Sequence, residues 1–182
     1  MDLVASFSSQ RVNTFNFFFV RGIFGDNDLL FLFDTGAACS VVGINSFFRE
    51  GRETIEKRKT LEELLKDEIK NKDVLPRNLK AANNQSVTTY PCICRSVSIE
   101  NTSERDFYFD ISFEDISIPL LGSSFIDDCA YNHAINGNIN ITGIKEKAGS
   151  EYYDECTLIE FDEIARKYAM KAILSDFFHI TL

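Results

Sequence analysis

Hydrophobic and polar positions follow two patterns along the chain: short apolar runs between polar turns, and longer stretches with helical spacing. The apolar runs at 14–24 and 29–34 flank the turn sequence Gly25-Asp26-Asn27-Asp28, which predicts a strand, a turn and a second strand. A third short strand is predicted at 39–43, followed by one or two helical turns at 44–51. The first part of the chain is therefore predicted to be mainly β.

Residues 53–72 change to a helical pattern. Apolar side chains recur there at near-helical spacing, at Ile55, Leu61, Leu64, Leu65 and Ile69. This spacing predicts a surface helix that ends near Lys72, with Pro76 beyond its end. Because β patterns stand on both sides of it, the helix is interpreted as an insertion into a β domain.

Strand patterns return after this helix. A hairpin is predicted in 79–91 around Asn83-Asn84-Gln85, and further strands at 94–100 and 105–113. An apolar run then leads through Gly122 into a short helix, and a second hairpin follows at 131–143 around Asn136-Gly137-Asn138.

The last part of the chain returns to helical spacing, at Leu158, Phe161, Ile164, Tyr168 and Ile173. We expect a domain at 1–145 that carries the 53–72 helical insertion, and a helical C-terminal extension at 146–182. The extension either covers one end of the β body or binds a partner, and we favour the first.

The amino-acid composition and net charge argue against some classes of function. Hydrophobic residues make up 45% of the 182 residues, which is enough for a packed core, and the net charge is −9. An acidic chain without a long basic run is a poor match for nucleic acid or an anionic membrane. The sequence opens with no signal-peptide pattern, and its apolar runs are too short to cross a bilayer. We therefore expect a cytoplasmic protein with reduced thiols.

Cysteine and histidine residues are candidate metal ligands in this chain. Cys92 and Cys94 lie on one face of a predicted strand, and Cys129 and His133 follow downstream. Zinc sites usually show two closely spaced Cys or His pairs, which this set lacks. The prediction is buried free thiols and no metal or other cofactor.

The stretch LLFLFDTGAACSVVG, residues 29–43, places a carboxylate at the end of an apolar strand. Burying a carboxylate is costly, so Asp34 belongs either to an ordinary surface turn or to a chemical site. An Asp-Thr-Gly triplet alone is weak, but here Ala37 follows it, a strand-turn-strand pattern precedes it, and Leu120-Leu121-Gly122 comes after several further strands. These features favour chemistry.

Three segments in this order resemble the retropepsin-like aspartic proteases, a family of single-lobed, homodimeric enzymes. They are FLFDTGAACSVVG at 31–43, LKAANNQSVTTYP at 79–91 and IPLLGSSFIDDC at 118–129. The resemblance covers about 15–143. It implies a closed β-barrel of the acid-protease fold and an aspartic endopeptidase that cleaves protein or peptide substrates.

Such chemistry uses two carboxylates that share a proton and activate a water. This chain has a single Asp-Thr/Ser-Gly triplet, so the second carboxylate would come from a second copy across a C2 axis. The exposed strands expected in the hairpin at 131–143 are the candidate for the sheet that joins the two copies. The alternative is a catalytically silent, dimeric peptide- or protein-binding module of the same shape.

The resemblance also implies roles for individual residues. Asp34 would be catalytic, Thr35 would hydrogen-bond across the dimer axis, Gly36 would allow the tight turn, and Ala37 would leave room for substrate. Leu120, Leu121 and Gly122 would pack against the Asp34 loop. A flap over the substrate would be formed by Ala82, Asn83, Asn84, Gln85, Ser86 and Val87.

Overall fold

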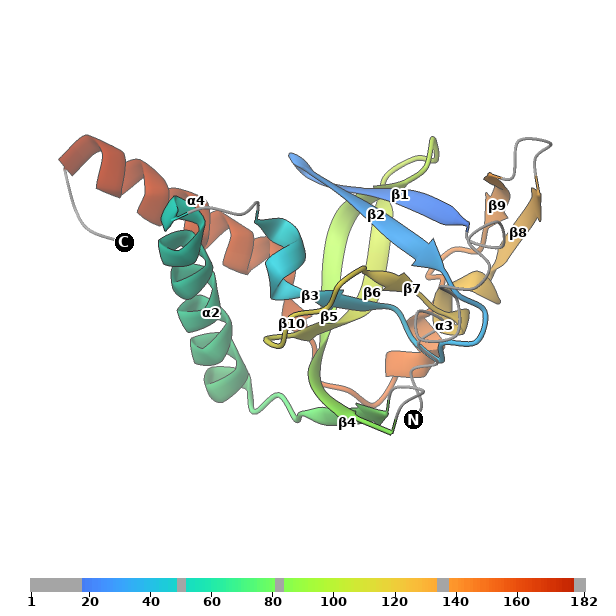
Figure 1. Cartoon of the computed structure of the whole chain (residues 1–182), viewed down its shortest axis with the longest axis horizontal. Helices are drawn as coiled ribbons and strands as arrows, with labels where there is room; N and C mark the ends of the chain where they lie inside the picture. Colours follow the sequence, from blue (N-terminus) through green and yellow to red (C-terminus); the bar gives the residue numbers. More distant parts are fainter. Residues whose placement is uncertain (1–17, 49–51, 81–83, 134–137, 179–182) are drawn as a thin grey trace.

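The computed structural model describes residues 18–48, 52–80, 84–133 and 138–178, and of 52–53 and 173–178 it describes the backbone alone. A β-barrel lies on one side of the molecule, and the helices α2 (Arg52–Lys72) and α4 (Phe161–Phe178) lie on the other (Figure 1). This mostly β architecture, with an inserted helix and a helical C-terminal extension, confirms the fold class predicted from the sequence.

Six strands close the barrel in the order β1-β2-β7-β3-β6-β5. They are β1 (Phe19–Phe24), β2 (Asn27–Phe33), β3 (Val41–Gly43), β5 (Ser86–Ile99), β6 (Arg105–Ser112) and β7 (Leu120–Leu121). The barrel closes where β1 also pairs with β5, through Gly22 opposite Ile99 and Phe24 opposite Val97. Closure leaves few free strand edges in the body of the protein.

The strand β5 differs from its sequence prediction. The sequence predicts two shorter strands here, one at the end of the 79–91 hairpin and one at 94–100, but a single strand of 14 residues runs from Ser86 to Ile99. A bulge between Cys94 and Val97 shifts its register against β6, and Ser96 takes a positive φ of 61° there. A bulge absorbs extra residues without ending the strand, which is why the polar Arg95-Ser96 pair does not break it.

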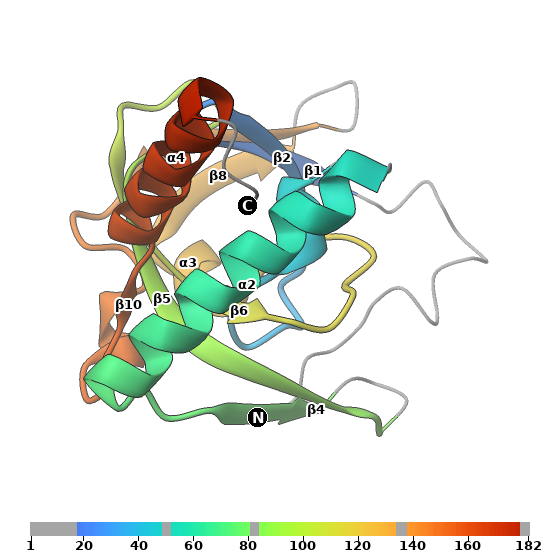
Figure 2. The ribbon, with the colours of Figure 1, turned by 90° about the vertical axis from the view of Figure 1, so that its left-hand side faces the viewer.

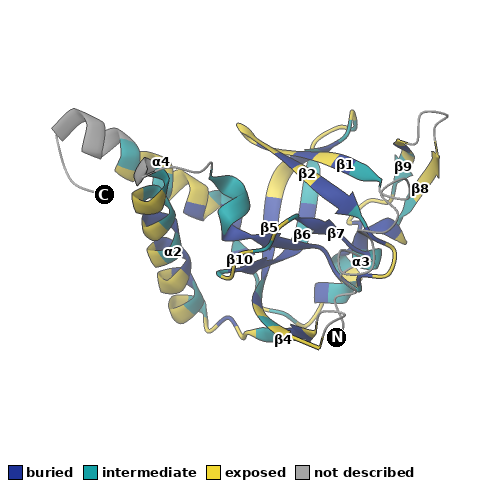
Figure 3. Ribbon diagram, in the orientation of Figure 1, coloured by how far each residue is buried: buried dark blue, intermediate teal, exposed yellow. Residues whose placement is uncertain are grey.

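Phenylalanine rings fill the barrel. The Phe107 ring centroid lies 5.7 Å from Phe31, 5.7 Å from Phe109 and 5.5 Å from Phe125. These four side chains are fully buried, and buried residues concentrate in the barrel strands (Figure 3). Tilted and offset ring contacts of this kind stabilise a core beyond the area they bury.

The inserted helix α2 has the predicted position and ends with a left-handed cap. Asp73 takes a φ of 53°, and the Val74 amide donates to the Ile69 carbonyl at 2.9 Å, as in a Schellman motif. Leu61, Leu64 and Leu65 are buried, but Ile55 is 68% exposed, so only part of the predicted apolar face packs. Arg58 holds the helix to the β6–β7 connection by donating to Asp115 at 2.7 Å and to the Phe113 carbonyl at 3.0 Å.

The C-terminal extension joins the barrel before it becomes helical. A short 3-10 helix, η3 (Ser150–Tyr153), is followed by β10 (Ile159–Glu160), which pairs in parallel with Cys92–Ile93 of β5. Helix α4 begins only at Phe161, so Leu158 lies before the helix and not on its face. The extension buries Tyr153, Ile159 and Ile164, and α4 packs beside α2 (Figure 2). Intramolecular packing, the favoured alternative, is what the described residues show.

A separate two-stranded sheet lies at the opposite end of the molecule from the long helices (Figure 1). It is the predicted second hairpin, formed by β8 (Cys129–His133) and β9 (Ile139–Ile144). Residues 136 and 137 of its predicted turn lie outside the described residues. None of the helices in the described part of the chain is long and apolar enough to cross a membrane.

Candidate active site

Asp34 follows the last residue of β2 and is 6% exposed. The strand is held there by β7, because Leu32 pairs with Leu120 and Phe33 with Leu121 in parallel register. The Asp34 amide continues this pairing by donating to the Leu121 carbonyl at 3.0 Å. The backbone of Asp34 is therefore fixed by two barrel strands at the start of the loop.

The Asp-Thr-Gly turn folds back on this carboxylate. The Gly36 amide donates to Asp34 Oδ1 at 3.0 Å, and the Ala37 amide donates to the Asp34 carbonyl at 3.1 Å. Ala37 is fully buried, whereas Thr35 and Gly36 are exposed in the single chain. The loop thus presents an open rim of two residues directly beside a buried carboxylate.

The second predicted motif packs against the far side of the same loop. The Gly122 amide donates to Ser40 Oγ at 3.1 Å, and a Cβ atom at Gly122 would lie 2.3 Å from the Cys39 carbonyl oxygen. No side chain fits in that space, so this position requires glycine. The structure therefore brings Leu120, Leu121 and Gly122 together with the Asp34 loop.

The short helix α3 (Ser123–Ile126) begins at this contact and satisfies loop carbonyls. The Ser123 amide donates to the Ala37 carbonyl at 2.7 Å, and the Ser124 amide to the Ala38 carbonyl at 3.0 Å. Buried backbone groups of a loop need such partners. Residues 34–40 are consequently held from β7 and α3 together.

The predicted flap corresponds to the hairpin of β4 (Arg77–Lys80) and the start of β5, with Lys80 opposite Ser86. Ala82 and Asn83 lie outside the described residues. Asn84 takes a left-handed φ of 64°, Asn84, Gln85 and Ser86 are exposed, and Val87 is half-buried. At the base of the hairpin Leu79 is buried in the cluster that includes Ala37 and Cys39, so the hairpin rests on the candidate catalytic loop.

A buried charged group that the sequence analysis missed lies behind this loop. Asp110 of β6 is fully buried and accepts hydrogen bonds from Arg77 Nε at 3.0 Å, Thr89 Oγ1 at 2.6 Å and the Tyr153 hydroxyl at 2.7 Å. A second bond joins its Oδ1 to the Arg77 guanidinium. The Asp110 amide also donates to the Ser40 carbonyl at 2.8 Å. The acid therefore connects the β4–β5 hairpin, the candidate catalytic loop and the C-terminal extension.

This network sets the protonation states around it. Burial acts to lower the pKa of Arg77, but the hydrogen bonds and charge of Asp110 outweigh it and hold that pKa above its ordinary value. Burial, followed by the charge of Asp110, raises the pKa of Tyr153 and that of Cys39. The guanidinium of Arg77 also stacks 4.7 Å from the Tyr153 ring centroid. Arg77 stays charged, and the phenol and the thiol stay neutral.

The signal for Asp110 in the sequence has the same form as the signal for Asp34. The stretch RDFYFDISF, 105–113, places an aspartate within an apolar strand, where a carboxylate needs a partner. Its partners Arg77 and Tyr153 are far away in the sequence. No spacing rule would have paired them.

Among the described residues, neither the thiols nor the acids are grouped as metal ligands would be. Cys39, Cys92 and Cys94 are buried free thiols, and Cys129 and Cys156 are partly exposed. In the described part of the chain, no group of three or more His, Cys, Asp or Glu side chains is placed to hold a metal ion.

Comparisons with known proteins give matches among solved structures but none in sequence. No protein-family model matches the chain, and no curated protein matches it in sequence. Among solved structures, a retropepsin-like aspartic protease from Rickettsia conorii is similar, with a TM-score of 0.43 and 17% identity over 71% of this chain and 92% of that chain.

Proposed function

We propose that the chain is an aspartic endopeptidase of the retropepsin-like kind, which cleaves peptide bonds through two Asp34 carboxylates brought together in a homodimer. The observation that carries the proposal is the loop geometry. Asp34 is buried at the end of β2, its Oδ1 accepts from the Gly36 amide, and Thr35 and Gly36 beside it are exposed. An open rim next to a buried carboxylate suits the approach of a second, identical loop.

In the proposed mechanism the paired carboxylates share one proton. One of them takes a proton from a water molecule as the water attacks the peptide carbonyl, and the protonated one polarises that carbonyl. The proton then passes to the leaving amine. Rigidity helps because the carboxylates must be held in place before the substrate arrives, and the contacts from β7, α3 and Ser40 supply it.

The proposed dimer contact includes the β8–β9 hairpin. The Tyr131 ring of β8 packs 4.8 Å from the Phe33 ring, next to Asp34 in the sequence, and most of β8 is exposed. An exposed sheet edge beside the candidate site is where a second copy would add strands. The flap hairpin would close over a peptide held between the two copies.

The test is cleavage of a diverse quenched-peptide library from pH 4 to 7 by the wild-type chain and Asp34→Asn. The matched control is Asp26→Asn, which removes the same charge from the exposed β1–β2 turn. We expect cleavage by wild type and the control, and none by Asp34→Asn. Activity per chain should also fall on dilution, because the active species is a dimer.

Mixing wild-type and Asp34→Asn chains distinguishes an active site that two chains share from an active site within each chain. A tenfold excess of Asp34→Asn should lower wild-type activity by about tenfold after subunit exchange, because most wild-type chains then pair with an inactive copy. The same excess of Asp26→Asn should not lower it. If a folded, dimeric wild type cleaves nothing, the chain is better described as the silent binding module of the same shape.

A further inference from the structure

The helices α2 and α4 enclose a pocket at the other end of β2 from Asp34. It has a volume of about 370 Å³ and is lined by Asn27, Phe47, Phe48, Thr54, Lys57, Leu61, Phe161, Ala165 and Tyr168. Asn27 begins β2 and Asp34 follows its end, so the pocket and Asp34 are about 23 Å apart along the strand. The volume falls within the range of small-molecule sites.

Aromatic rings form the walls of this pocket. The Phe47 ring of η2 (Ile44–Phe47) stacks on the Phe161 ring of α4, with centroids 4.9 Å apart. Phe48 lies 6.3 Å from Tyr168, which is one helical turn beyond Ala165. Leu61 of α2 is buried and closes the pocket on the helix side. The walls therefore suit an aromatic or aliphatic apolar body.

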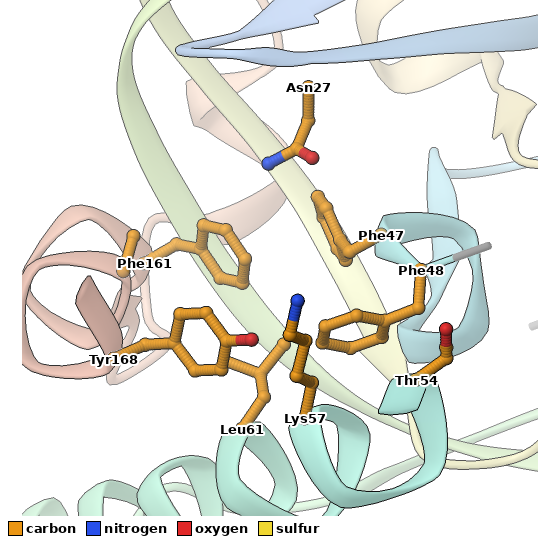
Figure 4. A pocket seen from close by; sticks show the side chains of 9 residues that line it. Asn27, Phe47, Phe48, Thr54, Lys57, Leu61, Phe161 and Tyr168 are labelled. Atoms are coloured by element: carbon orange, nitrogen blue, oxygen red, sulfur yellow. The ribbon is translucent and has the colours of Figure 1, made fainter. Parts of the chain in front are cut away.

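Among the residues that line the pocket, Lys57 of α2 is the one with a positively charged side chain. Lys57 is half-buried, and its ammonium group points between the rings of Phe48, Phe161 and Tyr168 (Figure 4). The Tyr168 hydroxyl and the Asn27 carboxamide face the same space (Figure 4). A lysine ammonium has three N–H donors and can bind more than one partner, so its positive charge at a largely apolar pocket, with the Tyr168 hydroxyl and the Asn27 carboxamide nearby, is complementary to a carboxylate.

We propose that this pocket binds a small carboxylate with an aromatic or aliphatic apolar body, with Lys57 at the carboxylate and the Phe47–Phe161 stack against the body. The pocket is built by the insertion and the C-terminal extension, so the proposal gives these two elements a common role. It does not depend on the proposed proteolysis, because the residues that carry it are separate from the Asp34 loop.

The probes are 4-phenylbutyrate, decanoate and 4-phenylbutanol, titrated calorimetrically into the full chain. The first two test an aromatic and an aliphatic body with the same carboxylate, and the alcohol keeps the aromatic body without the charge. We expect saturable binding of at least one acid, and binding of 4-phenylbutyrate about tenfold tighter than that of its alcohol. Binding of neither acid, or equal binding of 4-phenylbutyrate and the alcohol, would overturn the proposal.

Substitutions in and near the pocket test whether the acid binds there. Lys57→Met keeps the apolar stem and removes the charge, so it should abolish the preference for the acid. Lys59→Met removes the same charge from an exposed position of the same helix and should retain the preference. Ala165→Phe adds a ring at the exposed mouth of the pocket and should weaken the acid and the alcohol alike.

Each variant must be folded for its binding to be compared with that of wild type. Circular dichroism and the unfolding midpoint establish that each variant is folded, and Lys57→Gln replaces Lys57→Met if the latter is not. An acid preference that survives in a folded Lys57 variant places the carboxylate elsewhere and contradicts the proposal.

Discussion

The Tyr153 hydroxyl donates a 2.7 Å hydrogen bond to Asp110 Oδ1, and so links the C-terminal extension to the barrel strand behind the Asp34 loop. Both side chains are almost completely buried. Because Asp110 also binds Arg77 of β4 and Thr89 of β5, one carboxylate joins β4, β5 and the C-terminal extension. The extension is therefore part of the support of the candidate site.

Tyr153→Phe removes this hydrogen bond and leaves the ring in place. A hydrogen bond to a buried charged group contributes about 1.5–3 kcal/mol, so we expect the free energy of unfolding in urea to fall by about that amount. Tyr131→Phe, at the exposed edge of the β8–β9 hairpin, is the control and should unfold like wild type. Equal stability of the two variants would show that the Tyr153 hydroxyl makes no net contribution.

Arg77→Met is expected to be more costly than Tyr153→Phe. It removes both guanidinium contacts and leaves Asp110 buried without its counter-charge, a change that typically costs about 3–5 kcal/mol. Arg21→Met is the control, because its partner Asp28 is 57% exposed and such surface pairs contribute little. The measurement is again urea unfolding, and a loss at Arg77 no larger than at Arg21 would contradict a stabilising role.

Gly122→Ala and Gly143→Ala form a matched pair that tests the contact between the two predicted motifs. A Cβ at Gly122 would lie 2.3 Å from the Cys39 carbonyl oxygen, whereas at Gly143 the nearest atom is the Ala130 Cβ at 3.8 Å. We expect Gly122→Ala to displace the Asp34 loop and unfold at lower temperature, and Gly143→Ala to behave like wild type. Calorimetric unfolding curves measure this, and equal midpoints would show that the loop yields at no cost.

Local patterns predicted the elements of this fold well. The strand-turn-strand at 19–33, the helix at 52–72 and the second hairpin each depend on residues near one another in the sequence, so periodicity and turn residues were sufficient. The helical extension predicted at 146–182 differs from the structure at its start, because η3 and β10 precede the helix α4, which begins at Phe161. Pairing of Ile159 with Cys92 of β5 decides the conformation of β10, and such a distant contact leaves no periodic trace.

For the candidate site too, local sequence patterns predicted some residues and missed others. Asp34 was found because an aspartate after an apolar run is conspicuous and because Thr35, Gly36 and Ala37 follow it. Asp110 has a similar local context but was missed, since its partners Arg77 and Tyr153 are 33 and 43 residues away. Side-chain networks between distant segments need the fold before they can be recognised.

Buried thiols predict a loss of stability at alkaline pH. Burial raises the pKa of Cys39, Cys92 and Cys94 above the ordinary value, and partial burial raises the pKa of Cys129 to about 12. In the unfolded chain these thiols titrate near pH 8.5. Below that pH both states hold the proton. Above it the unfolded state loses the proton and the folded state keeps it, so the free energy of unfolding falls until the folded pKa is passed.

Cys92→Ala isolates one of these thiols, since Cys92 is fully buried. Urea unfolding of wild type and variant from pH 7 to 10 should give a steeper alkaline decline for wild type, by up to about 1.4 kcal/mol per pH unit above pH 8.5. The variant itself is expected to be less stable at pH 7 because it loses buried sulfur contacts, so the two curves converge as the pH rises. Parallel curves would contradict the prediction, because they would mean that the Cys92 thiol ionises equally in the folded and unfolded states.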